Sequence, residues 1–104
     1  MQDNAPGHAA KSVKAELQRL GIPTMTWPAF SPDLNPIETL WNWMKDWIYW
    51  HYTEAQLQEN YLVLRRAVTE AWDAIPEALL QDSIDSMQKR CQDVINARGK
   101  HTKW

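Results

Sequence analysis

Two acidic residues, Asp3 and Glu38, have the types and surroundings of metal-binding carboxylates. Asp3 lies in the segment Met-Gln-Asp-Asn-Ala-Pro-Gly-His, and Glu38 ends the segment Ser-Pro-Asp-Leu-Asn-Pro-Ile-Glu, with thirty-four residues between them. Each carboxylate lies among turn-forming residues at the end of an apolar stretch. This position suits carboxylates that are held at the edge of a sheet. Paired carboxylates of this kind can hold divalent cations for phosphoryl chemistry. The pattern therefore indicates metal-dependent chemistry at phosphorus.

Glu38 also has a purely structural interpretation. Asn35 can be the N-cap of a helix whose first residue is Pro36. A glutamate three positions after the cap can then close a capping box with the backbone of Asn35. The local signals support the two interpretations about equally, and the Asp3 segment at a matching distance favours the metal ligand.

Two longer segments carry a specific resemblance. Asp-Asn-Ala-Pro-Gly-His, followed by Trp-Pro-Ala-Phe-Ser-Pro-Asp-Leu-Asn-Pro-Ile-Glu-Thr-Leu-Trp, closely resembles transposases of the Tc1/mariner type, most of all the fungal ones. Asp3 and Glu38 match the second and third residues of that family's Asp-Asp-Glu catalytic triad, with the family's 34-residue interval. The C-terminal segments 85–95 and 98–104 resemble the family's tail, so the resemblance runs through the whole chain.

The resemblance implies an RNase H-like catalytic domain that cleaves DNA and joins strands. In the intact family, three carboxylates hold two Mg²⁺ or Mn²⁺ ions, and DNA is the substrate. Asp3 and Glu38 would then be both catalytic residues and metal ligands. Acidic residues are required because these hard cations prefer oxygen ligands.

Part of the family's machinery has no counterpart in these 104 residues. In such transposases the first aspartate lies on an upstream strand, and helix-turn-helix modules bind DNA. The chain therefore looks like a truncated C-terminal part of a transposase. Two carboxylates should hold Mg²⁺ weakly, because this ion requires near-octahedral coordination. We expect weak or no metal binding, weak DNA binding, and no activity by the chain alone.

A dense tryptophan cluster supports an alternative function. Seven tryptophans occur in 104 residues, and four of them fall between positions 41 and 50. Such density indicates an interface as well as a core, because large aromatic side chains dominate burial at both. We expect an interaction surface at Trp43, Trp47 and Trp50, used for self-association as a homo-oligomer, which we favour, or for a protein partner. The other alternative is a chain that repacks into a helical bundle with these three residues in its core. A non-catalytic interaction module is therefore the alternative to the endonuclease.

The composition limits the protein's class. The length fits one domain over residues 1–104, with the acidic pair in residues 1–50 and further helices in residues 51–104. A net charge of −2 argues against strong non-specific binding to nucleic acid. One cysteine gives no internal disulfide, and no signal peptide or membrane span is visible. We expect an intracellular protein, located in the nucleus if the host is eukaryotic.

Apolar spacing predicts mostly helical structure. Helices are expected over residues 9–20, from Pro36 to about Tyr49 or His51, and over about 54–74, with Gly21 ending the first and Thr53 capping the third. Pro76 is expected to start a new turn or the last helix, which runs to just before Gly99. Residues 4–7 and 28–36 have loop composition. Residues 1–3 and 22–27 are expected to form two parallel strands with a right-handed crossover. The predicted fold class is α/β by ancestry and mostly α by content, with about five helices and a short two-strand sheet.

The helical periodicity also predicts which side chains form the core. The expected stripes are Ile37, Leu40, Trp41, Met44 and Ile48; Leu57, Tyr61, Leu64, Val68 and Trp72; and Leu80, Ile84, Met87, Cys91 and Val94 or Ile95. Cys91 is expected to be buried. His8 is expected to be a loop or capping residue near the active site. Asp33 is expected to form an Asx-type turn and not to replace a metal ligand.

Overall fold

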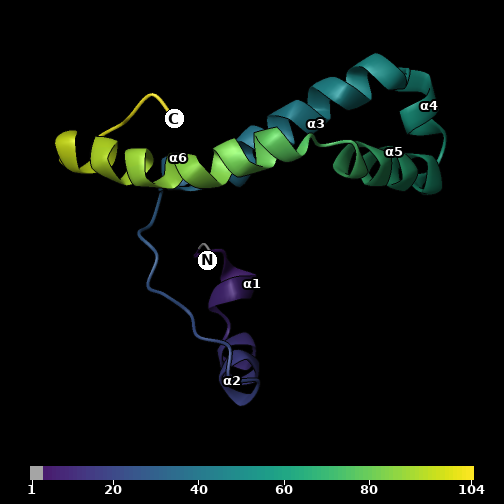
Figure 1. Ribbon diagram of the computed structural model, residues 1–104. Helices are drawn as coiled ribbons and strands as arrows, with labels where there is room; N and C mark the ends of the chain where they lie inside the picture. Colours follow the sequence, from purple (N-terminus) through teal and green to yellow (C-terminus); the bar gives the residue numbers. More distant parts are fainter. Residues whose placement is uncertain (1–3) are drawn as a thin grey trace. The chain divides into compact units, whose positions relative to one another are not determined.

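The computed structural model describes residues 4–104. These residues form six α-helices and one 3-10 helix, and none of them lies in a strand (Figure 1). They belong to two compact units, one ending at Ser31 and the other spanning Pro32–Trp104. No helix among residues 4–104 is both long enough and apolar enough to cross a bilayer.

The predicted two-strand sheet is therefore wrong. Residues 22–27 have no regular secondary structure, and Ile22 and Met25 are 48% and 65% exposed. The other expected strand, residues 1–3, lies outside the described residues. An isolated two-stranded sheet is marginal in water, so apolar and β-branched residues do not form a strand without stable neighbours. The described chain is all-helical where it is regular.

The first unit contains α1 (Pro6–Ala9) and α2 (Lys11–Arg19). Pro6 begins α1, so Pro6 and Gly7 are helical where a loop was predicted; proline is compatible with a first helical turn because its missing N–H needs no partner there. Helix α2 ends at Arg19, and the predicted stop residue Gly21 follows two positions later with a φ of +67°. The Gly21 and Ile22 N–H groups donate to the carbonyls of Gln18 and Leu17 at 3.1 and 2.9 Å, which forms a Schellman motif.

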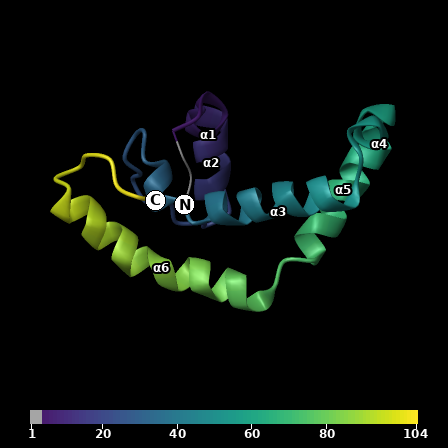
Figure 2. The same ribbon diagram turned by 90° about the horizontal axis from the view of Figure 1, so that it is seen from above.

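The second unit contains η1 (Pro32–Leu34), α3 (Ile37–His51), α4 (Glu54–Glu59), α5 (Tyr61–Asp73) and α6 (Glu77–Asn96). Helix α3 contacts both α5 and α6, η1 contacts α6, and α4 contacts α5 (Figures 1 and 2). The bounds of α3 and α6 agree closely with the predicted helices. Helix α3 carries Glu38 in its first turn.

The predicted helix over residues 54–74 is two helices, because two polar caps follow one another. Thr53 accepts a hydrogen bond from the Gln56 N–H at 3.2 Å, and the Gln56 side chain accepts one from the Thr53 N–H at 2.8 Å. This capping box confirms the predicted role of Thr53. Asn60 is extended and its side chain accepts from the Val63 N–H at 3.1 Å, which ends α4 and begins α5.

The buried apolar side chains lie on faces that differ from two of the three predicted stripes. In α3 the prediction holds for Leu40 and Met44, which are 5% and 8% exposed, but Trp41 is 44% exposed. In α5 the buried residues are Ala67 and Ala71, both 0% exposed, whereas the expected core residues of that helix are exposed: Tyr61, Leu64, Val68 and Trp72. Small side chains on the contact face let α5 approach its neighbours closely.

The buried face of helix α6 overlaps the predicted stripe only in part, at Met87 and Val94, which are half-buried. Its buried residues are the polar Ser83 and Arg90, whereas Leu80 and Ile84 are exposed. Cys91, expected inside, is exposed because it lies one position beyond Arg90 on the helix. The helix ends at Asn96, and Arg98 takes up the left-handed conformation with a φ of +52°. The last residues, 100–104, have no regular secondary structure.

Candidate active site

Glu38 lies in the first turn of α3 and lines a hollow of about 420 Å³ in the second unit. Its neighbours in the lining are Pro32, Thr39, Asn42, Arg90, Lys103 and Trp104. Glu38 is half-buried, and its carboxylate makes no hydrogen bond or ion pair with any residue between 4 and 104. Burial of a carboxylate without a partner costs free energy, which a bound cation can offset.

The capping box proposed for Glu38 does not form. Asn35 does act at the helix start, since its side-chain oxygen accepts from the Ile37 N–H at 3.4 Å. The Asn35 N–H, which a capping glutamate would bind, instead donates to the carbonyl of Pro32 at 2.9 Å. Because the Asn35 N–H already donates to η1, it does not bind the Glu38 side chain.

Arg90 lies beside Glu38 in the same hollow and is only 4% exposed. Its guanidinium donates from Nε to Ser86 Oγ, from one terminal nitrogen to the Asp33 carbonyl, and from the other to Thr39 Oγ1, at 2.8, 3.2 and 3.1 Å. Burial lowers the pKa of Arg90, and the negative charge of Asp33 acts in the opposite direction. The positively charged guanidinium of Arg90 therefore donates its hydrogen bonds to three uncharged oxygens.

The C-terminal tail covers this guanidinium. The Trp104 ring lies 4.4 Å from Arg90 Cζ, and its Nε1–H donates to Asp93 Oδ2 at 2.9 Å. Lys103 Nζ lies 4.8 Å from the same ring. Thr102 Oγ1 donates to Asp33 Oδ2 at 3.3 Å. The Asp33 side chain therefore binds the tail and does not form the expected Asx-type turn.

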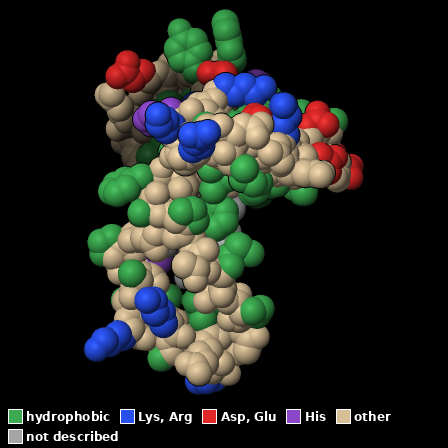
Figure 3. Space-filling model, turned by 90° about the vertical axis from the view of Figure 1, so that its left-hand side faces the viewer, with side chains coloured by type: hydrophobic (Ala, Val, Ile, Leu, Met, Phe, Trp, Pro, Cys, Tyr) green, Lys and Arg blue, Asp and Glu red, His purple; other side chains and the backbone are tan. Residues whose placement is uncertain are grey.

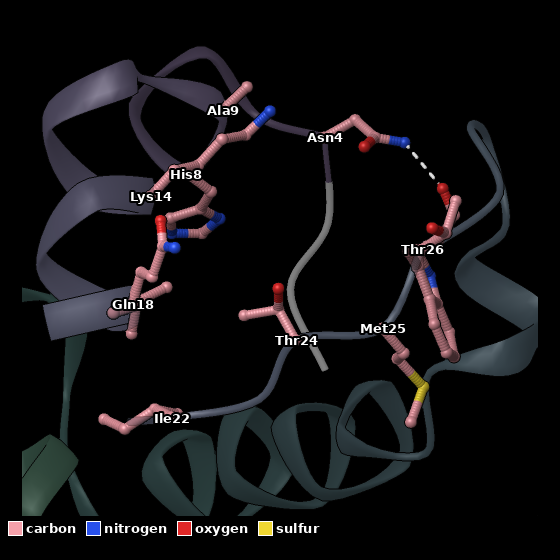
Figure 4. A pocket seen from close by; sticks show the side chains of 11 residues that line it. Asn4, His8, Ala9, Lys14, Gln18, Ile22, Thr24, Met25 and Thr26 are labelled. Atoms are coloured by element: carbon pink, nitrogen blue, oxygen red, sulfur yellow. Dashed lines mark hydrogen bonds between the residues drawn. The ribbon is translucent and has the colours of Figure 1, made fainter. Parts of the chain in front are cut away.

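Asp3 lies outside the described residues, so its position relative to Glu38 is not described. The residue after it, Asn4, is anchored within the first unit because its side-chain N–H donates to the Trp27 carbonyl at 3.0 Å (Figure 4). A hollow of about 530 Å³ lies between α1, α2 and residues 22–27 of this unit. His8 lines it from helix α1, together with Lys14 and Gln18 of α2, whereas the sequence placed His8 in a loop or cap.

The described residues provide one metal ligand of the expected kind. The carboxylate of Glu38 has the oxygen chemistry that Mg²⁺ and Mn²⁺ prefer, and nothing between residues 4 and 104 competes for it. That part of the chain contains no group of three or more acidic, histidine or cysteine side chains able to share an ion. Arg90 and Lys103 line the same hollow and repel cations. Any ion at Glu38 therefore needs ligands from beyond this hollow.

The three tryptophans of the predicted interaction surface all lie on α3 at helical spacing. Trp50 is 79% exposed and contacts the Tyr49 ring edge-on, with 5.5 Å between ring centroids. Trp47 is half-buried and stacks on His51 at 3.8 Å. Trp43 is half-buried as well. The surface is thus exposed mainly at its Trp50 end.

Residues 1–59 match a known protein family described as DDE superfamily endonuclease. Over 103 residues the chain is 36% identical to the Tcb2 transposase of Caenorhabditis briggsae, and over 104 residues it is 39% identical to the Tc1 transposase of Caenorhabditis elegans. Each alignment covers 99% of this chain and 36% of the relative. The Tc3 transposase of Caenorhabditis elegans is 33% identical over 98 residues, which cover 94% of this chain and 29% of the relative.

The chain thus spans about a third of the length of these curated relatives. No solved structure matches it significantly.

Proposed function

Because the chain belongs to the DDE superfamily of endonucleases, we propose that Asp3 and Glu38 are metal-binding carboxylates of a site that cleaves DNA and transfers strands. They would be the second and third carboxylates of that site. Tc1/mariner-type transposases are among the chain's relatives. The observation that carries the proposal is the half-buried Glu38 carboxylate, which has no partner between residues 4 and 104.

Endonuclease domains of this superfamily generally depend on a divalent metal. Glu38 would hold the ion from the first turn of α3, and Asp3 would hold it from the segment before α1. When bound, such ions activate the attacking oxygen and stabilise the leaving oxygen of an in-line displacement at phosphorus. The chain's own contribution is to present oxygen ligands from two different elements.

The surroundings of Glu38 suit a phosphate backbone. Lys103 lines the hollow, and Arg98 and Lys100 are exposed nearby in the sequence. Figure 3 shows Lys and Arg side chains on one face, with Asp and Glu side chains among them. Because phosphates attract cations even on a protein with a net charge of −2, DNA can approach Glu38 beside the C-terminal tail that carries Arg98, Lys100 and Lys103.

These 104 residues by themselves should be inactive on DNA, because they supply two acidic members of a triad and Mg²⁺ binds such a pair weakly. The first test is incubation of the purified chain with supercoiled plasmid and Mn²⁺, which should leave the plasmid intact. Plasmid nicking that Glu38→Gln abolishes would contradict inactivity, although it would support the proposed role of Glu38.

The second test adds the family's first aspartate on a separate polypeptide. A polypeptide that carries the first aspartate, taken from one of the nematode relatives, is added to the chain with DNA and Mg²⁺. Strand transfer should appear with the natural sequence and disappear with Asp3→Asn or Glu38→Gln. The matched control is Asp46→Asn, which changes an exposed carboxylate of α3 and should leave transfer in place. Transfer that survives Glu38→Gln would overturn the proposal.

The exposed aromatic residues of α3 favour a second candidate function, self-association through Trp43, Trp47 and Trp50. Tyr49 and Trp50 are 77% and 79% exposed, and exposed aromatic patches of this kind mark interaction sites. Trp50→Ala should shift the chain toward monomer in sedimentation equilibrium. Trp72→Ala, which truncates a 49% exposed tryptophan on α5, is the control. A natural chain that is monomeric at tens of micromolar would refute this function.

A further inference from the structure

Arg90 joins segments that are far apart in the sequence on both sides of Glu38. One terminal nitrogen binds the Asp33 carbonyl, 57 positions away, and the other binds Thr39 Oγ1, 51 positions away. The planar guanidinium holds these two acceptors in a fixed geometry, because its nitrogens form a rigid fork. Glu38 lies between the two acceptors in the chain, so the turn that carries it is tied to α6 at both ends.

The C-terminal tail holds Arg90 in this position. The Trp104 ring covers the guanidinium and is itself fixed by its hydrogen bond to Asp93 of α6. Thr102 binds the side chain of Asp33, the residue whose carbonyl Arg90 also binds. Arg90 makes no ion pair with a carboxylate among the described residues, so the cation–π contact with Trp104 compensates part of its desolvation.

We infer that Arg90 is a positioning residue for Glu38, and that Thr102 and Trp104 form a clasp that keeps Arg90 in place. The link to catalysis depends on the proposed function, whereas the clasp itself does not. Arg90 acts through the backbone around Glu38: it fixes the start of α3, and with it the direction from which the carboxylate is presented. Lysine cannot replace it, because a single ammonium nitrogen cannot hold two acceptors with the geometry of the fork.

Amide hydrogen exchange without metal tests the clasp directly. Arg90→Lys and Arg90→Met should each speed exchange in residues 32–41 about ten-fold or more, while exchange in residues 54–73 stays unchanged. Trp104→Phe, which keeps an aromatic ring but loses the bond to Asp93, should give a smaller increase in the same segment. Arg65→Lys and Arg65→Met, at an exposed arginine of α5, are the matched controls and should change neither segment.

Two outcomes would overturn the inference. The first is unchanged exchange in residues 32–41 of the Arg90→Lys chain. The second is an equal increase in residues 32–41 and 54–73 in both the Arg90→Lys and the Trp104→Phe chains, since that would show general destabilisation. Trp104→Phe keeps the test decisive if the Arg90 variants do not fold.

Mn²⁺ binding separates the clasp from the proposed function. Arg90→Lys should weaken Mn²⁺ binding about ten-fold, as loss of a supporting contact behind a metal ligand does, whereas Glu38→Gln should abolish it. A natural chain that binds no Mn²⁺ at Glu38, even with the polypeptide that carries the first aspartate added, would refute the proposed function and leave the exchange result to decide on the clasp. Equal Mn²⁺ affinity in the natural and Arg90→Lys chains would overturn the positioning role.

Discussion

The contact between α3 and α5 gives the sharpest prediction about the fold. Ala67 and Ala71 are fully buried, and together with Leu40 and Met44 they are the buried apolar residues found among residues 4–104. Ala71→Leu adds three carbon atoms to a side chain that is 0% exposed. Overpacking of this kind costs about 1–3 kcal/mol of the free energy of unfolding. A small domain has only about 5–15 kcal/mol in total, so the loss is a large fraction.

Urea unfolding followed by far-UV circular dichroism measures this loss. Ala71→Leu should lower the midpoint, and Ala78→Leu, the same change at an exposed position of α6, should alter stability by less than about 0.5 kcal/mol. Trp72→Ala discriminates further, because Trp72 is 49% exposed. It should cost less than the roughly 3–5 kcal/mol of a buried tryptophan.

The reasoning fails if Ala71→Leu is as stable as the natural chain while Trp72→Ala loses the full amount expected of a buried side chain. That result would place Trp72, as the periodicity first suggested, in the core and Ala71 on the surface.

Three further perturbations test local features. Thr53→Ala removes the cap of α4 and should cost about 1 kcal/mol of stability, measured by urea unfolding. Arg98→Gly should raise stability by up to about 1 kcal/mol in the same measurement, because glycine adopts a φ of +52° without strain. The hydrogen bond from Tyr52 to Glu70 raises the pKa of Tyr52, so the folded chain holds this proton more tightly than the unfolded chain. Its contribution to stability is complete below the ordinary tyrosine pKa of about 10 and is lost as the pH rises through the raised value. In ultraviolet titration, the phenolate signal of Tyr52 is the one that is absent from the Tyr52→Phe chain. This signal should appear at lower pH in the Glu70→Gln chain than in the natural chain. A signal at the same pH in both chains would exclude this hydrogen bond.

Local signals predicted the helices well because the residues that cap or stop a helix lie within a few positions of its end. Gly21 ends α2 and Thr53 caps α4, as the sequence indicated. The break at Asn60 was missed, although its side chain is a strong cap, because the apolar spacing continues through it. The prediction of a strand over residues 22–27 was wrong because a strand needs neighbouring strands to pair with. The β-propensity of these residues does not replace such pairing.

The core faces and the clasp depend on tertiary contacts that spacing does not reveal. The periodic large residues of α5 gave the wrong face, because Ala67 and Ala71 allow close approach and carry little hydrophobic signal. Arg90 gave no signal beyond the basic pair Lys89-Arg90. Two of its partners, Asp33 and Thr39, are separated from it by more than fifty positions, and no local rule connects them. The acidic pair was identified from the motif, and its convergence on one ion stays a prediction.

One measurement tests the shared metal site most directly: the broadening of amide NMR signals by substoichiometric Mn²⁺. If Asp3 and Glu38 hold the same ion, the signals of Asn4 and Thr39 broaden together in the natural chain. Asp3→Asn or Glu38→Gln should then remove the broadening at both positions, and Asp46→Asn, at an exposed carboxylate of α3, should remove it at neither. Broadening of one position that survives substitution of the other carboxylate would contradict the account, because it would show two independent sites.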